Sequence, residues 1–170
     1  MQDMGQPLGG VAEGLPMLLL PLLAAGIALA RERRSSGRAA TSRAGWLWVL
    51  ATASVVAAVV HATVAPEHFA ESALYGTFFL ATTVAGFAYA VLVLAKPSRP
   101  VLLVGVAANA AIVALWLITR LVEVPVGPGA GEREAFGVMD VVASSAEVLC
   151  VVAAMSLLHA VRNLTARFPG

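Results

Sequence analysis

Charged side chains are scarce in this chain of 170 residues: Asp, Glu, Lys and Arg make up 12% of it, against about 25% in a typical soluble domain. Hydrophobic residues make up 59%, and the mean hydropathy is +0.86. So few polar side chains do not cover a water-facing surface, which excludes a soluble globular enzyme and a disordered chain. A net charge of +1 gives no field to attract a polyanion, so no nucleic-acid partner is expected.

Cysteine is nearly absent as well. The chain has a single cysteine, Cys150, which excludes an internal disulfide framework and a cysteine-based zinc knuckle. A nucleophile–base pair, a glycine-rich phosphate loop and a dinucleotide fingerprint are also missing from the sequence. An enzyme is therefore not favoured, and one would need a metal ion with an open coordination position. No internal repeat stands out, which weakens the case for an inverted-repeat transporter.

Long apolar runs are what the sequence has instead. A transmembrane helix needs ~20 apolar residues to cross ~30 Å of hydrocarbon. Five segments approach or meet this length, namely 15–30, 46–64, 74–95, 101–121 and 138–161. We therefore predict an all-α fold, a polytopic transmembrane bundle of five helices that forms one integral membrane domain over residues 1–170.

The first segment differs from the other four. It is short and contains Pro16 and Pro21, and the second of these removes an internal hydrogen bond and kinks a helix. If it does not span, four helices remain. A cleaved signal peptide is a poor alternative, because no Lys or Arg precedes the segment.

Positive charge predicts the orientation. Nine of the eleven basic residues lie in the stretch 31–43, in the turn 96–99 or in the C-terminal tail, and only Arg120 and Arg133 lie on the opposite side. The positive-inside rule makes the side with nine cytoplasmic. We expect the N-terminus outside and the C-terminus in the cytoplasm.

Small residues mark helix faces that can approach closely in lipid. Thr82, Gly86 and Ala90 recur every four residues in the third predicted helix, and Gly105 and Asn109 do so in the fourth. These faces are expected to form helix–helix contacts, although the high alanine content also produces such spacings by chance.

Ionisable residues inside hydrocarbon need a partner or a purpose. If Pro66 starts a helical turn, Glu67 and Glu71 share a face and His68 adjoins Glu71. Helical rise places several further polar residues in the outer half of the membrane, with His61 at a depth between Asp140 and Glu147. We expect one pocket there, lined by His61, Glu67, His68, Glu71, Arg120, Asp140 and Glu147. His159 lies at the opposite end of its helix and is excluded.

Three interpretations of this pocket remain open. The first is a metal site for Cu, Zn, Fe or Mn, with His61, His68, Glu67, Glu71 and Glu147 as candidate ligands. The second is a structural network in which Arg120 neutralises Glu147 or Asp140 and His61 bonds an acid. The third is a proton or cation pathway through Glu147. The supporting polar residues in each case are Arg120, Asp140, Ser54, Asn109 and Cys150.

Function follows these interpretations. The leading hypothesis is a small membrane protein that binds a transition metal or another small ligand in the outer half of the bilayer. The alternatives are a structural or assembly subunit of a larger membrane complex, and a proton- or cation-coupled transporter or channel. The expected partners are the lipid bilayer and other membrane subunits or further copies of the chain.

Two sequence runs carry a family resemblance. The first is His61…Ala65-Pro66-Glu67-His68-Phe69 with Tyr75-Gly76-Thr77-Phe78-Phe79-Leu80. The second is Leu115-Trp116…Arg120…Pro125-Val126-Gly127-Pro128, followed by Gly137…Asp140 and Glu147. Over roughly 61–147 the chain resembles a family of uncharacterised actinobacterial multi-pass membrane proteins. The resemblance implies a bacterial plasma membrane and brings no known activity.

Overall fold

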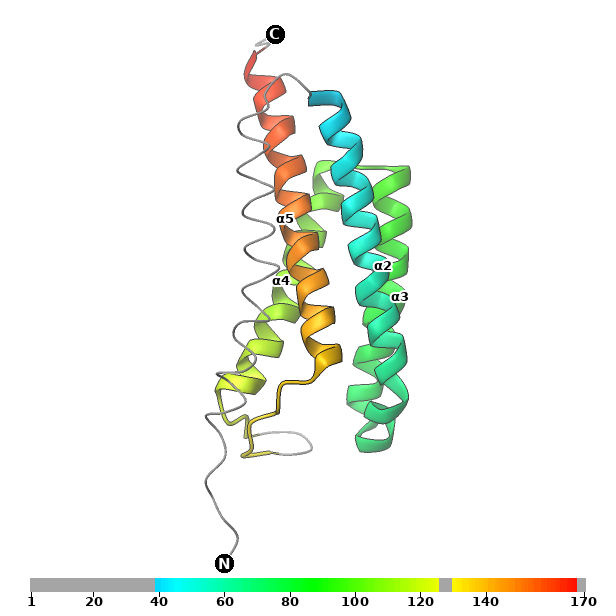
Figure 1. Ribbon diagram of the computed structural model, residues 1–170, viewed down its shortest axis with the longest axis vertical. Coiled ribbons are helices and arrows are strands. Elements are labelled where there is room, and N and C mark those ends of the chain that lie inside the picture. Colours follow the sequence, from blue (N-terminus) through cyan, green and yellow to red (C-terminus); the bar gives the residue numbers. More distant parts are fainter. Residues whose placement is uncertain (1–38, 126–129, 168–170) are drawn as a thin grey trace, which may run out of the picture.

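The computed structural model of the protein describes residues 39–125 and 130–167. Within these ranges the chain forms four helices and no strand (Figure 1). The helices are α2 (Ala39–Glu71), α3 (Ala73–Ala95), α4 (Arg99–Leu121) and α5 (Val138–Arg167). Each contains a segment long and apolar enough to cross a membrane. The all-α prediction is therefore confirmed for the last four predicted helices, while the first, 15–30, lies outside the described residues.

Helix α2 is longer than the predicted 46–64 at both ends, and it continues through Pro66. The expectation that Pro66 begins a new helical turn is wrong. Proline lacks the N–H that would bond the Ala62 carbonyl, yet both residues are exposed, close to the end of the helix. The unpaired carbonyl is therefore not buried, and the helix is not broken.

The helix boundaries follow local capping rules. Ser72 is extended and accepts a hydrogen bond from the Leu74 N–H, which caps the start of α3. Ser98 precedes α4, and Pro100 occupies its first turn, where a missing N–H does no harm. The connections on either side of α3 are short as a result.

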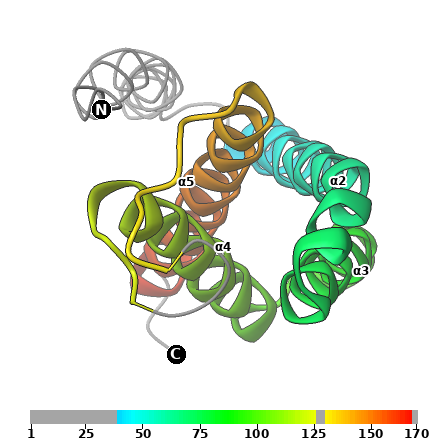
Figure 2. The same cartoon turned by 90° about the horizontal axis from the view of Figure 1, so that it is seen from below.

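The helices pack in the order α3, α2, α5, α4. Helix α2 contacts both α3 and α5, and α5 also contacts α4, whereas α3 and α4 barely touch although they are adjacent in sequence. Figure 2 shows this order in a view down the long axis of the bundle. Interfaces with α5 therefore bring together residues far apart in the chain.

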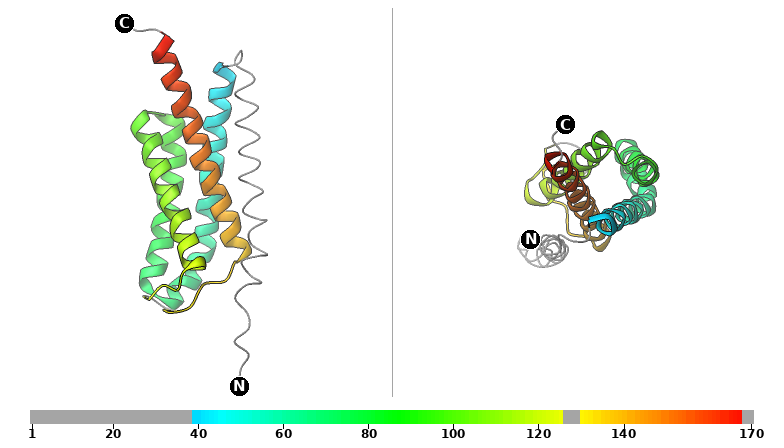
Figure 3. Two further views of the ribbon diagram at one scale, coloured as in Figure 1. Left: turned by 90° about the vertical axis from the view of Figure 1, so that its left-hand side faces the viewer. Right: turned by 90° about the horizontal axis from the view of Figure 1, so that it is seen from above.

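The bundle has two ends. The start of α2, the connection from α3 to α4 and the last turns of α5 lie together, and we call this the Lys96 end (Figure 3). The α2–α3 junction and the connection from α4 to α5 lie at the other, the Glu71 end. This matches the alternation expected of successive membrane-spanning helices.

The α2–α3 interface depends on a close approach at Gly86. The Ser54 hydroxyl donates a 2.8 Å hydrogen bond to the Gly86 carbonyl. A Cβ at Gly86 would lie 3.0 Å from the Cβ of Ala58, so a larger side chain would push the helices apart. Gly86 and Ala90 thus form a contact face as predicted, whereas the Thr82 hydroxyl bonds carbonyls of its own helix.

The hydrophobic core lies in the half of the bundle nearer the Lys96 end. All four described helices contribute to it. Its buried members are Leu50, Ala51, Ala53, Ala90, Val93, Leu102, Cys150, Ala153, Ala154 and Leu157. Large apolar side chains elsewhere on α3 and α4 are exposed, such as Leu74, Val84, Val91 and Val104, as expected of surfaces that face lipid.

Candidate functional site

A buried histidine–glutamate pair joins α2 to α5. Nε2 of His61 lies 2.9 Å from Oε1 of Glu147, and the two residues are only 6% and 1% exposed. His61 lies ten residues before the end of α2 and Glu147 nine residues after the start of α5, about 15 and 14 Å along their helices. The equal depth brings the two side chains together across the α2–α5 interface.

Each member of this pair keeps one polar atom without a partner. Nδ1 of His61 and Oε2 of Glu147 are buried and form no hydrogen bond with any described residue. Burying an unsatisfied polar atom costs roughly 1–3 kcal/mol, and a lone charge in hydrocarbon costs more. The pair is therefore an expensive feature that folding alone does not require.

A second polar group links α4 to α5 nearer the Glu71 end. Arg120 is 6% exposed, and its guanidinium lies 2.8 Å from Asp140 and 2.9 Å from Glu134. The guanidinium carbon also lies 5.2 Å from the centre of the Trp116 ring, within cation–π range. The predicted ion pair between Arg120 and Asp140 is thus formed, while Glu147 contacts His61 instead.

Glu134 was missed in the sequence analysis. It lies in the connection between α4 and α5, where no helical spacing relates it to Arg120. Its backbone N–H donates to the Thr119 carbonyl at 3.0 Å, which fixes the connection against the end of α4. Two carboxylates contact one guanidinium here. The local excess of acidic residues is visible in the sequence, but it does not fix the position of Glu134 relative to Arg120.

A third pair lies near the surface at the Glu71 end. Nδ1 of His68 lies 3.0 Å from Oε2 of Glu71, and the side chains are 27% and 53% exposed. The predicted i, i+3 contact is therefore formed. Glu67 is exposed on the same turn of α2.

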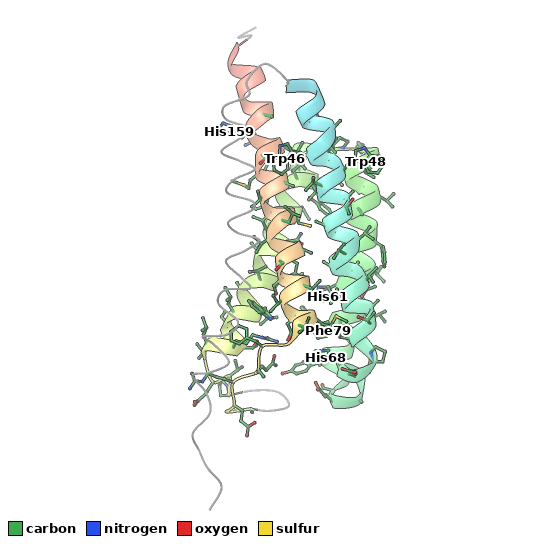
Figure 4. The ribbon with its side chains drawn as sticks, in the orientation of Figure 1. Trp46, Trp48, His61, His68, Phe79 and His159 are labelled. Carbon is green, nitrogen blue, oxygen red and sulfur yellow. The ribbon has the colours of Figure 1, made fainter. Side chains whose placement is uncertain are left out.

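The ring of Phe79, which belongs to the first motif run but was assigned no place in the site, lies between the His61–Glu147 pair and the His68–Glu71 pair. Phe79 of α3 stacks on the His68 imidazole, with centroids 4.0 Å apart and planes inclined by 4°. The same ring lies 5.5 Å from the His61 imidazole at an angle of 53°. Figure 4 shows His61, Phe79 and His68 following one another toward the Glu71 end, with His159 at the other end.

The remaining predicted polar residues lie apart from the His61–Glu147 pair. Ser54 bonds Gly86, as described above, and the Asn109 amide donates to the Gly105 carbonyl of its own helix at 2.8 Å. The Cys150 thiol is buried in the apolar core and lies 3.8 Å from the Leu50 carbonyl oxygen. Ser54 and Cys150 thus lie at contacts between helices, whereas Asn109 bonds a carbonyl within α4.

The predicted pocket is therefore divided. In the part of the chain that the structure describes, no three His, Cys, Asp or Glu side chains gather closely enough to hold a metal ion. Asp140 and Glu147 are seven residues apart on α5, a separation of ~10.5 Å along the axis. The single shared pocket is thus replaced by three separate polar groups: the His61–Glu147 pair between α2 and α5, the Arg120 group between α4 and α5, and the His68–Glu71 pair within α2.

A shallow groove of about 390 Å³ lies between α2 and α5, away from these pairs. Its lining is almost entirely apolar: Trp48, Val49, Thr52, Ala53, Val56, Ala146 and Leu149. A groove with this lining suits an acyl chain or an apolar helix face, since among its lining residues Thr52 and Trp48 alone have a polar side-chain atom.

Models of known families, curated proteins and solved structures were compared with the chain, and none of them matches it. The resemblance to actinobacterial membrane proteins stays a prediction that rests on the two motif runs.

Proposed function

We propose that this protein is an integral membrane protein that binds a transition-metal ion between His61 and Glu147. The observation that carries the proposal is the buried 2.9 Å contact between an imidazole nitrogen and a carboxylate oxygen. Two ligands about 2.0–2.2 Å from one metal ion lie about 2.8–3.6 Å apart, for angles from ~90° to the tetrahedral value. The pair therefore has the separation of two adjacent metal ligands and needs little movement to become them.

Metal binding at this pair would release one proton. Without metal, a proton lies between Nε2 of His61 and Oε1 of Glu147. A divalent ion that takes its place is held by a neutral imidazole and a carboxylate, and the proton is released to solvent. Nitrogen and oxygen donors suit Zn, Cu, Fe or Mn, and water or a small ligand completes the coordination.

Metal content of the purified full chain tests the proposal. The wild type is reconstituted with Cu, Zn, Fe or Mn in detergent, washed and analysed, beside His61→Ala and Glu147→Gln. We expect close to one ion per chain in the wild type and a loss in both variants. His159→Ala is the matched control, because His159 is exposed at the opposite end of the bundle, and it keeps the wild-type content.

A proton is the second candidate cation. This candidate is favoured by the small number of donors, since only two ligating side chains meet at the pair. A wild type that takes up none of the four metals, with a carboxyl stretching band that shifts with pH and disappears in Glu147→Gln, would replace metal binding by proton exchange. If neither readout responds and both variants lose stability, the pair is structural.

The proposed orientation places the Glu71 end outside the cytoplasm, in a bacterial plasma membrane. The described charges support it: Arg43, Lys96 and Arg99 lie toward the Lys96 end, whereas Glu123, Glu132 and Glu134 lie toward the Glu71 end. Single cysteines at Ser36 and Glu132, in a Cys150→Ser background, test it in intact cells. An impermeant maleimide is expected to label Glu132→Cys only, and labelling of Ser36→Cys from outside would refute the orientation.

A further inference from the structure

The buried pair has a more exposed counterpart on the same helix. His68 follows His61 by seven residues, or two turns of α2, so the two residues lie on one face of the helix, with a backbone rise of about 10.5 Å between them. Each has a glutamate within 3.0 Å of a ring nitrogen. The two pairs therefore offer the same donor chemistry at two depths.

Phe79 contacts both imidazoles from α3. Its ring lies flat on His68 and is tilted against His61, so it stands between the half-exposed pair and the buried one. On the far side of this ring, His61 is 6% exposed and its Nδ1 bonds no described residue. Nδ1 of His61 therefore has a free lone pair or proton, which is available to a cation or reagent that passes the Phe79 ring.

We propose that His68 and Glu71 form an outer capture site for a cation and that the Phe79 ring is the barrier between this site and the His61–Glu147 pair. For the identity of the cation, this inference rests on the proposed function. The corner between α2 and α3 is closely packed, so a cation that passes from the outer pair to the buried pair has to displace the Phe79 ring. The Phe69 ring fills the space that a Cβ at Gly76 would occupy, which holds the last turn of α2 against α3.

Two consequences separate the capture site from the buried site. A barrier changes how fast the buried pair is reached and leaves the number of ions bound at equilibrium unchanged. Replacing His68 therefore slows metal loading at unchanged final content, whereas replacing His61 removes the content itself. A side chain with only a structural role would not produce this division between rate and amount.

Histidine modification by diethyl pyrocarbonate tests the barrier without any metal. The full chain in detergent is treated, and the rate at each histidine is read by mass spectrometry. In the wild type His68 and His159 react fast and His61 slowly. In Phe79→Ala the His61 rate rises by roughly tenfold or more, because access no longer waits for the ring to move, while His159 is unchanged.

Phe78→Ala is the matched control. Phe78 is the neighbouring residue and packs against the Phe79 ring, with centroids 5.5 Å apart, but has no stacking contact with either histidine. It leaves the His61 rate at the wild-type value. If Phe79→Ala does not fold, Phe79→Leu replaces it, because leucine keeps apolar bulk at this position. An intermediate rate of His61 modification is expected for it, because leucine covers His61 less completely than the phenylalanine ring does.

The outcomes separate this inference from the proposed function. If the wild type binds metal but both Phe79 variants leave the His61 labelling rate and the loading rate unchanged, the barrier is wrong and the metal site stands. If the wild type binds no metal but Phe79→Ala exposes His61, the barrier stands for protons and the metal proposal falls. A His61 that reacts as fast as His68 in the wild type overturns the barrier outright.

Discussion

The two halves of the bundle are built from the same four helices but by different interactions. Toward the Lys96 end, the buried side chains are apolar and small, such as Ala51, Ala90 and Ala153, and pack around Leu50 and Leu102. Toward the Glu71 end, the buried side chains include a histidine, a glutamate and an arginine, held in pairs of 2.8–2.9 Å. One half is built as a packing core, and the other retains ionisable groups in a setting where they are costly.

This difference is the reason for proposing a binding site in the Glu71 half. Association of helices in lipid depends on close van der Waals packing, which the Lys96 half supplies without any charge. A buried ion pair is often no more stabilising than a well-packed apolar replacement. The Glu71 half therefore contains groups that folding does not need, and such groups in membrane proteins mark pathways and binding sites.

Breaking the buried pair is expected to have the largest effect on stability. His61→Ala leaves the Glu147 carboxylate buried without its partner and lowers the free energy of unfolding by about 3–5 kcal/mol. The double replacement His61→Leu with Glu147→Leu removes both polar groups and recovers most of this loss. Unfolding in mixed detergent micelles measures both, and a double variant as unstable as His61→Ala would contradict the comparison of the two halves.

A cavity in the packing core comes next. Leu50 is fully buried, and Leu50→Ala is expected to cost about 2–5 kcal/mol through lost contacts and an unfilled space. Leu80→Ala is the control, because Leu80 is 50% exposed to the lipid side and its removal leaves no cavity. The same unfolding assay compares them, and equal losses would mean that the Lys96 half is not the packing core.

Removal of the arginine is expected to have a smaller effect. Arg120→Ala lowers the free energy of unfolding by about 1–3 kcal/mol, because Asp140 and Glu134 are partly exposed and regain hydration. Arg133 lies 3.9 Å from Glu123 on the surface, so Arg133→Ala changes stability by less than about 1 kcal/mol. Equal melting temperatures of the two variants would argue against a buried role for Arg120.

The smallest effect is expected at the α2–α3 contact. Ser54→Ala removes one hydrogen bond to the Gly86 carbonyl, and such bonds between membrane helices average about 0.6 kcal/mol. Gly86→Val keeps that carbonyl but adds side-chain atoms close to Ala58, and a larger loss is expected from it. A greater loss in Ser54→Ala than in Gly86→Val would show that the hydrogen bond, and not the close approach, holds this interface.

Much of the fold was predictable from the sequence, because hydropathy and length mark each spanning helix independently of the others. The predicted start at 138 and end at 121 agree with α5 and α4. The continuation of α2 through Pro66 was not predictable, since it depends on Ala62 and Pro66 both being exposed. The order in which helices pack was not predictable either, because hydropathy does not say which apolar face meets which.

The composition of the site was predictable, but the pairing of its residues was not, and their depth only in part. Counting residues from the predicted helix ends placed His61 at a depth between Asp140 and Glu147. The continuation of α2 to Glu71 makes His61 level with Glu147, and the α2–α5 contact joins the two. Glu134 and Phe79 were missed because their roles depend on a connecting segment and on the rotation of α3. A helical count fixes neither of these. The expectation of a single pocket was wrong for the same reason. His61 lies at the α2–α5 interface and Arg120 at the α4–α5 interface, and this separation follows from the order in which the helices pack.

Metal titration of two variants tests the central claim most directly, namely that the buried pair binds a cation and the packing core does not. The His61→Leu and Glu147→Leu double variant is compared with Leu50→Ala in the same detergent. The account predicts that the double variant is the more stable of the two and binds no metal, whereas Leu50→Ala is less stable and still binds close to one ion per chain. Metal binding by the double variant equal to that of Leu50→Ala would contradict it.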